Sequence, residues 1–189
     1  MKCKRLVMML IVFPMLPLSM VVRVEAHDPG LSAADLRIER SRVVANLTLA
    51  RGDVESVARI DTNSDGELTQ EEFEAARPRL EDLAASSLEL RMDGRLASVS
   101  GASVDPGESN AIHFLVTFDI EPGSELSVRS MFVGRLARGH RQYVSIVDER
   151  NNKLGERILD AGDDLFLLKC GLSSAGAPQS FSQFVMLGI

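Results

Sequence analysis

Cysteine is nearly absent from this sequence. The 189 residues include two cysteines, Cys3 and Cys170. We expect Cys3 to leave with an N-terminal export signal, so that Cys170 has no partner for a disulfide inside the chain. A disulfide-stapled fold is therefore excluded, and stability must come from packing. We expect Cys170 to be a small buried hydrophobic residue, because nothing in the neighbouring sequence indicates an activated thiol.

Positive charge is also in deficit, with 21 Lys and Arg against 27 Asp and Glu and a formal net charge of −6. Such a surface repels nucleic acid and favours cations. The sequence further lacks a nucleophile elbow, a phosphate-binding loop, a Cys–His pair with a local signature and the spacing of zinc ligands. We therefore predict no nucleic-acid partner and no enzyme.

Residues 1–26 have the composition of an export signal. Basic residues within the first five precede the apolar run 6–22, and a small-residue cleavage site follows at 24–26. An uncleaved membrane anchor is the alternative, since an apolar run of this length is at the lower limit for crossing a bilayer. Pro14 and Pro17 interrupt the run. We therefore predict cleavage and a periplasmic or secreted protein.

Alternation of apolar and polar residues predicts many short strands. Residues 34–50 alternate with period two and break at the polar cluster 39–42, which predicts two strands joined by a turn. Asp93 and Gly94 suit the two-residue turn of a hairpin. Further strands are expected at 111–118, 126–131, 142–147, 153–158 and 164–168. This spacing predicts a mainly β fold, an Ig-like β-sandwich, over residues 27–172.

Residues 53–85 change to helical spacing, and we predict that they form an insertion between strands. Asp53 is expected to cap a short helix whose apolar face includes Val54 and Ile60. An acidic loop follows, and helical spacing then resumes. Pro78 lies inside this second run and should kink the helix or begin a new one, because it lacks an N–H and clashes with the preceding turn.

The acidic loop reads DTNSDGELTQEE over residues 61–72. It matches the calcium-loop pattern D-x-[DN]-x-[DN]-G-x5-E at every specified position, with Gly66 at the sharp turn. Calcium prefers about six to eight hard oxygen ligands. The predicted ligands are the side chains of Asp61, Asn63 and Asp65, the carbonyl of Glu67, Thr69 directly or through a water, and both carboxylate oxygens of Glu72.

An acidic turn without a bound metal is the alternative interpretation. Clusters of Asp, Asn and Gly form ordinary loops, and Thr69 with Glu72 is also the pattern of a helix capping box. The two interpretations compete for Glu72, because its carboxylate cannot cap the helix and bind an ion with the same oxygens. Gathering Asp61, Asp65 and Glu72 without a cation is repulsive, so we expect a looser loop in the absence of metal.

From about residue 53 to 77, the helix, loop and helix resemble the EF-hand family, which implies Ca²⁺ as the ligand. EF-hands usually occur in pairs joined at loop position eight, here Leu68. We find no second loop, since 148–159 begins with an acid but lacks the required Gly and final Glu. An unpaired loop indicates a modest affinity, with a Kd of about 10⁻⁴ to 10⁻³ M as in extracellular modules.

The three histidines provide a second candidate metal site. Signal cleavage would expose His27, whose amine and imidazole can chelate Cu²⁺ or Ni²⁺ when a second histidine approaches. His113 and His140 are the only candidates for that second ligand. The structural alternative is that His27 is a frayed end and that His113, within a strand, is a packed residue.

A second resemblance covers nearly the whole region after the signal. The stretches AHDPGLSAADLRIE, RPRLEDLAASSLELRMDGRL, ARGHRQYVSI and SFSQFVMLGI look like the exported N-terminal region of HupE/UreJ-like membrane proteins. That family is associated with transport of nickel or related metals, and its end segment leads into a His-rich bundle of membrane helices. The resemblance implies a membrane partner, beside which this chain serves as a calcium-binding module or delivers nickel or copper.

Residues 173–189 are predicted to be a linker and an apolar tail. SSAGAPQS has the composition of a flexible linker, and SFSQFVMLGI is apolar but too short to cross a bilayer. The tail either packs back on the β domain or lies on a membrane surface or in a partner groove. We favour the second arrangement, because the linker allows detachment.

Overall fold

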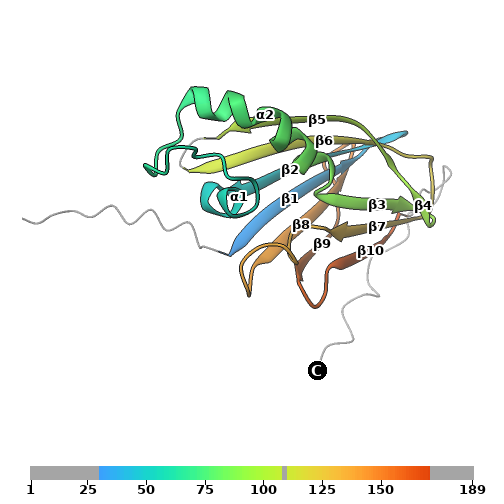
Figure 1. The fold of residues 1–189 in the computed structure, drawn as a ribbon. Coiled ribbons are helices and arrows are strands. Elements are labelled where there is room, and N and C mark those ends of the chain that lie inside the picture. The colour runs from blue at the N-terminus through green and yellow to red at the C-terminus, as the bar shows by residue number, and fades with distance from the viewer. Residues whose placement is uncertain (1–29, 108–109, 171–189) are drawn as a thin grey trace, which may run out of the picture.

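The structure, a computed structural model, describes residues 30–107 and 110–170 (Figure 1). Over these residues the chain forms ten strands in two sheets and two helices. The mainly β prediction is thereby confirmed for the described part of the chain. The predicted signal at 1–26 and the predicted linker and tail at 173–189 lie outside the described residues.

The larger sheet has six strands in the order β5-β6-β2-β1-β8-β9. They are β1 (Leu31–Ile38), β2 (Arg42–Ala50), β5 (Ser98–Pro106), β6 (Ala111–Asp119), β8 (Arg141–Asp148) and β9 (Lys153–Asp160). Neighbouring strands are antiparallel except β1 and β8, which run parallel. The turns that follow β1 and β8 therefore lie at the same end of this sheet.

The smaller sheet has four antiparallel strands in the order β10-β7-β3-β4. They are β3 (Leu88–Met92), β4 (Arg95–Leu96), β7 (Glu125–Ser130) and β10 (Leu165–Lys169). The predicted hairpin at Asp93 and Gly94 is confirmed, with φ of 47° and 80°. Positive φ at both central residues matches the twist of the flanking strands, which is why Asp-Gly suits this turn.

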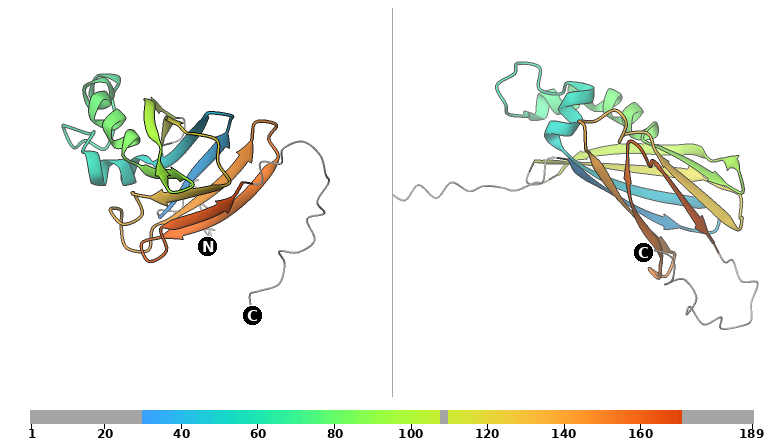
Figure 2. Two further views of the ribbon diagram at one scale, coloured as in Figure 1. Left: turned by 90° about the vertical axis from the view of Figure 1, so that its right-hand side faces the viewer. Right: turned by 90° about the horizontal axis from the view of Figure 1, so that it is seen from below.

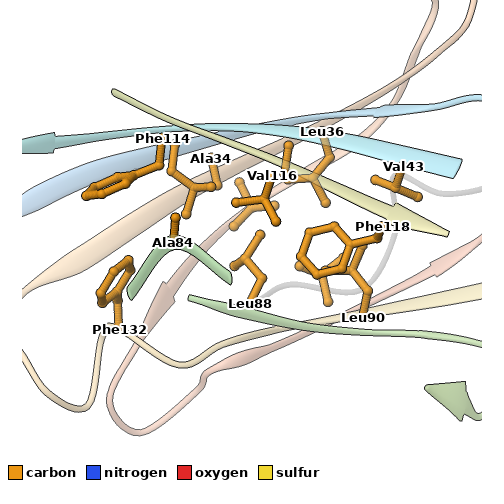
Figure 3. Close-up of a cluster of buried hydrophobic side chains, with 14 of the residues drawn as sticks. Ala34, Leu36, Val43, Ala84, Leu88, Leu90, Phe114, Val116, Phe118 and Phe132 are labelled. Atoms are coloured by element: carbon orange, nitrogen blue, oxygen red, sulfur yellow. The ribbon is translucent and has the colours of Figure 1, made fainter. Parts of the chain in front are cut away.

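The apolar faces of the two sheets meet in one core (Figure 3). Val116 and Phe118 of β6 point toward Leu88 and Leu90 of β3, and Phe114 lies farther along the same face of β6. All five side chains are at most 4% exposed, and the residues between them on each strand are more exposed. Because alternate residues of a strand point to opposite faces, period-two alternation in the sequence supplies this core. Burial of each large side chain stabilises the fold by about 1.5–3 kcal/mol.

Two helices interrupt the strands between β2 and β3. Helix α1 (Arg51–Ala58) follows β2 directly, and α2 (Gln70–Ala85) packs along β5 and β6 and touches α1. Figure 2 shows both helices on the same side of the molecule. Phe73 and Leu80 bury one face of α2. The guanidinium of Arg77 donates to the carbonyl of Val104 at 2.9 Å, which fastens α2 to β5.

One detail of the helical prediction is wrong, and one of the two alternatives for Pro78 is excluded. Asp53 is not the N-cap of α1, because the helix already begins at Arg51 and its N-cap, Ala50, makes no side-chain capping bond. Pro78 does not begin a new helix, because α2 continues through it to Ala85. Pro78 and the residue one turn before it are exposed, so water can satisfy the carbonyl that the missing N–H leaves free.

Candidate metal centre

The loop from Arg59 to Thr69 joins α1 to α2, and after the left-handed Arg59, with a φ of 46°, its backbone turns sharply at two further residues. Ser64 has a φ of 60° and Gly66 has a φ of 83°. A Cβ at Gly66 would meet no atom within 4 Å, so the backbone angle alone makes glycine favourable there. Ser64 adopts a conformation that is uncommon outside glycine, and a neighbouring carboxylate supports it.

That carboxylate belongs to Asp61. Its Oδ1 accepts a hydrogen bond from the Ser64 amide at 2.7 Å, and its Oδ2 accepts one from the Gly66 amide at 2.9 Å. The loop backbone is therefore wrapped around the side chain of Asp61. Glu55 of α1 accepts the amides of Ile60 and Asp61 at 2.7 and 2.9 Å, which fixes the start of the loop to the helix before it.

Asn63 and Asp65 form a second set of short-range bonds. Oδ1 of Asn63 accepts the Asp65 amide at 2.9 Å, and Oδ1 of Asp65 accepts the Glu67 amide at 2.8 Å. The Asn63 amide group donates to Asp65 Oδ2 at 2.8 Å. A guanidinium N–H of Arg51 donates to the Gly66 carbonyl at 2.5 Å, so α1 also contacts the middle of the loop. These bonds place Asp61, Asn63 and Asp65 in one tight turn.

Glu72 closes the loop from its far end. Its Oε1 accepts the amide and hydroxyl of Thr62 at 2.9 and 2.8 Å and the Asn63 amide at 3.3 Å, and its Oε2 accepts the amide and hydroxyl of Thr69 at 3.1 and 3.0 Å. The Thr69–Glu72 pair is a capping box at the start of α2. The Thr62 hydroxyl and the Thr69 and Thr62 amides lower the pKa of Glu72 to about 2, against the opposing effect of burial.

The carboxylates face loop amides in this arrangement and do not converge on one point. Within residues 30–107 and 110–170, no group of three or more His, Cys, Asp or Glu side chains is placed to hold a metal ion. Glu67 and Thr69, whose carbonyl and hydroxyl complete the predicted ligand set, are exposed beside them. The donors fit calcium by chemistry, since all are hard oxygens, but Glu72 must exchange amide partners to bind an ion.

The histidines lie apart from one another. His113 is exposed on β6, with Nδ1 3.0 Å from the Thr48 hydroxyl, and His27 lies outside the described residues. His140, just before β8, is buried, with Nε2 3.0 Å from the Ser32 hydroxyl. Two strands, β2 and β1, separate β6 from β8, so the strands carrying the two rings are about 14 Å apart. One ion cannot bind both His113 and His140.

A second polar site was not predicted from the sequence: the buried polar cluster, consisting of Ser32, Asp53, His140 and Gln142. His140 Nδ1 lies 3.7 Å from Asp53 Oδ2, and among the described residues neither atom has a hydrogen-bond partner. Gln142 is fully buried, pairs with Ser32 in the parallel register, and has no partner for either side-chain polar atom. Burial lowers the pKa of His140, and Asp53 opposes that shift.

Sequence alternation could have shown that two members of this cluster, Ser32 and Gln142, are buried. Gln142 occupies the same strand face as the buried Val144 and Ile146, and Ser32 the same face as Ala34 and Leu36. Period-two alternation therefore places both polar residues toward the core.

No protein-family model matches the chain, and a search of curated proteins also finds no match. The resemblances to EF-hands and to HupE/UreJ-like proteins stay predictions. Neither helix of the described residues is long and apolar enough to span a membrane.

Proposed function

We propose that this chain is an exported calcium-binding module that carries one EF-hand, formed by α1, the loop 61–72 and the start of α2. In this proposal the two sheets form an Ig-like sandwich, and the EF-hand is inserted between its strands. The module has a structural or sensory role beside a membrane partner. The net negative charge of the chain supports a cation as its ligand.

The hydrogen bonding of Asp61 is the observation that supports this proposal best. Its carboxylate gathers the amides of Ser64 and Gly66, so the loop is folded around the side chain predicted to be the first ligand. The positive φ of Gly66 is what the sixth position of a calcium loop requires. Both features fall at the positions that the calcium-loop pattern assigns to them, in register with Asn63 and Asp65.

Glu72 would complete the site. Its low pKa keeps the carboxylate charged at neutral pH, and its Oε1 already reaches Thr62 and Asn63 at the start of the loop. A bound Ca²⁺ would supply the positive charge that offsets repulsion among Asp61, Asp65 and Glu72. Binding would then tighten the loop and stabilise the folded chain by linkage.

Calorimetric titration of the purified chain with Ca²⁺ tests the proposal. We expect a Kd of about 10⁻⁴ to 10⁻³ M and a rise in melting temperature equivalent to about 1.4 kcal/mol at ten times Kd. Glu72→Gln should abolish binding at millimolar Ca²⁺ while leaving the far-ultraviolet circular dichroism of the sheets unchanged. Glu71→Gln removes the same charge from the neighbouring exposed residue and should leave Kd within about threefold. Equal affinity in the Glu72→Gln protein would exclude this loop as the site.

Binding of nickel or copper for a HupE/UreJ-like transporter is the second candidate function. One observation favours it: the amide of Arg141 donates to the carbonyl of Gly30 at 2.7 Å, so the described chain begins beside His140. His27 is three residues earlier in the sequence and lies outside the described residues. Parallel titration with Ni²⁺ and Cu²⁺ tests this candidate. His140→Gln should weaken binding and His113→Gln should not; no binding of either metal excludes it.

A further inference from the structure

A cavity of about 630 Å³ opens at one end of the two sheets, where the turns after β1 and β8 meet the loop between β6 and β7. Its apolar lining comes from both sheets and their connections: Ile38, Met92, Ile120, Pro122, Leu154 and Cys170. Its volume is in the range of small-molecule sites, about 300–1,000 Å³. β2 runs away from this end toward α1, so about 27 Å of strand separates the cavity from the calcium loop.

The cavity leads from the surface into the core. Met92, Ile120 and Cys170 are between 5% and 8% exposed and belong to the core cluster, whereas Leu154 is 38% exposed at the mouth. Burial raises the pKa of the Cys170 thiol, which keeps it neutral and apolar in character, as predicted. The deep wall therefore offers a water-excluding surface to an apolar group.

The wall is held in place by a loop that is fastened to the β3–β4 hairpin. Asp93 accepts the amides of Ser124 and Glu125 at 3.1 and 2.9 Å. Gly123 approaches so closely that a Cβ there would lie 2.4 Å from Met92 Cγ. These contacts keep the loop from collapsing into the cavity, so the space is preformed.

Charges of both signs surround the mouth. The parallel register pairs Ile38 with Asp148, so the Glu-Arg dipeptides at 39–40 and 149–150 are neighbours. Glu39 forms an ion pair with Arg42. The carboxylate of Asp148 accepts the backbone amides of Arg150 and Asn152. Among the described residues, the side chains of Arg40, Glu149 and Arg150 have no ion-pair partner.

We propose that this cavity binds a single-chain zwitterionic phospholipid, with its acyl chain against the apolar wall and its headgroup at the mouth. Arg40 and Arg150 would contact the phosphate, and Glu149 would contact the ammonium group. A free fatty acid offers only the negative charge, and an alkyl ammonium only the positive one. The inference is independent of calcium binding, because it involves none of the loop residues.

The chain has no tryptophan, so an introduced one reports on the cavity alone. We expect a lysophosphatidylethanolamine with a spin-labelled acyl chain, kept below its micelle concentration, to quench the fluorescence of the Leu154→Trp protein. The Leu167→Trp protein is the matched control, because Leu167 is 55% exposed on β10 and does not line the cavity. Equal quenching of both proteins, or quenching of neither, overturns the proposal.

Headgroup selectivity is tested by calorimetry on the unsubstituted chain. We expect lysophosphatidylethanolamine to bind at least about tenfold tighter than palmitate, which loses the contact with Glu149, or dodecyltrimethylammonium, which loses the contacts with Arg40 and Arg150; tenfold corresponds to about 1.4 kcal/mol. Arg40→Glu with Arg150→Glu should abolish this preference. Arg135→Glu with Arg138→Glu makes the same change in net charge at exposed residues away from the mouth and should preserve it. Palmitate binding as tightly as the lysophospholipid overturns the assignment of a zwitterion.

Discussion

Hydrogen bonding differs between the acidic loop, residues 61–72, and the buried polar cluster. In the exposed loop, both carboxylate oxygens of Asp61, Asp65 and Glu72 accept hydrogen bonds. In the cluster, where water is excluded, Asp53 Oδ2, His140 Nδ1 and both polar atoms of Gln142 lack partners among the described residues. These three loop carboxylates are thus satisfied, including the buried Glu72, whereas several buried polar atoms of the cluster are not.

The difference follows from how far apart the partners lie in the sequence. No hydrogen bond within residues 61–72 joins residues more than ten positions apart, and the bond from Arg51 to the Gly66 carbonyl spans 15 positions, so the local sequence alone can form these bonds. The cluster joins Ser32, Asp53 and His140, which only the completed fold brings together. An unpartnered buried polar group costs about 1–3 kcal/mol.

Removal of the central acceptor of the loop should give the largest effect. Asp61→Ala leaves the amides of Ser64 and Gly66 without their acceptor. Hydrogen bonds to charged groups are worth about 1.5–3 kcal/mol, so exchange of these two amides should accelerate by about 10- to 100-fold without calcium. Hydrogen exchange measured by nuclear magnetic resonance checks this. Glu67→Ala, which removes an exposed carboxylate from the same loop, should leave both rates unchanged. Unchanged rates in Asp61→Ala would mean that the backbone holds the loop unaided.

Replacement of Gln142 in the buried polar cluster should stabilise the folded chain, in contrast to the loss of protection expected for Asp61→Ala. Gln142→Met keeps a similar shape and removes two unpartnered polar atoms, so it should raise the free energy of unfolding by about 1–2 kcal/mol. Urea denaturation measures the change. Gln70→Met is the control, because Gln70 is exposed and bonds to Glu74 at 2.7 Å, and it should not stabilise the chain. Destabilisation by Gln142→Met would show that the amide has a partner, such as a buried water.

Sequence patterns predicted the elements of the fold that are determined by interactions between residues close together in the chain. The Asp-Gly turn, the strands with alternating burial and the helices on both sides of residues 61–72 follow from neighbours in the sequence, and all appear in the structure. β5 was missed because it is mostly exposed and polar, so it has no period-two pattern. Its place is set by β6 and by the helix packed on it.

The candidate sites also differ in how far the sequence alone predicts them. The match of residues 61–72 to the calcium-loop pattern could be read from the sequence because that pattern is local, whereas the hydrogen bonds from Thr62 to Glu72 are seen only in the folded loop. The cluster and the cavity require the parallel pairing of β1 with β8, two strands about 110 residues apart. No sequence pattern specifies that pairing, so neither site could be located before the fold.

Acidification should weaken the cluster. The pKa of His140 is below its ordinary value of 6.5 because the ring is buried, with Asp53 as the carboxylate facing it. Above pH 6.5 the ring is neutral in both states. As the pH falls through 6.5 toward the folded pKa, the unfolded chain takes up the proton first, and the free energy of unfolding falls. Urea denaturation at pH 7.5 and 5.5 should show this loss.

The matched substitutions separate His140 from other titrating groups. His140→Gln should reduce the loss of stability between pH 7.5 and 5.5, whereas His113→Gln, at an exposed strand position, should not. The imidazole resonances of the unsubstituted protein provide an independent measurement, which stays informative if a variant fails to fold. A His140 ring that titrates above 6.5 would mean that Asp53 outweighs burial, and the cluster would then be stabilised by acid.

The smallest effect concerns Glu72, and it tests whether the hydrogen bonds of the loop hold its carboxylate. Its ordinary pKa of 4.5 is lowered to about 2, so its contribution to stability is complete above pH 4.5 and is lost as the pH falls from 4.5 toward 2. A carboxyl titration by nuclear magnetic resonance without calcium measures the pKa of Glu72 directly.

The Thr62 hydroxyl makes the largest contribution to the lowered pKa of Glu72, so Thr62→Val should raise that pKa. Ser64→Ala removes an exposed hydroxyl from the same loop and should leave the pKa of Glu72 unchanged. A Glu72 that titrates near 4.5 in the unsubstituted chain would mean that the loop amides do not hold its carboxylate, and the contrast with the unpartnered cluster would disappear.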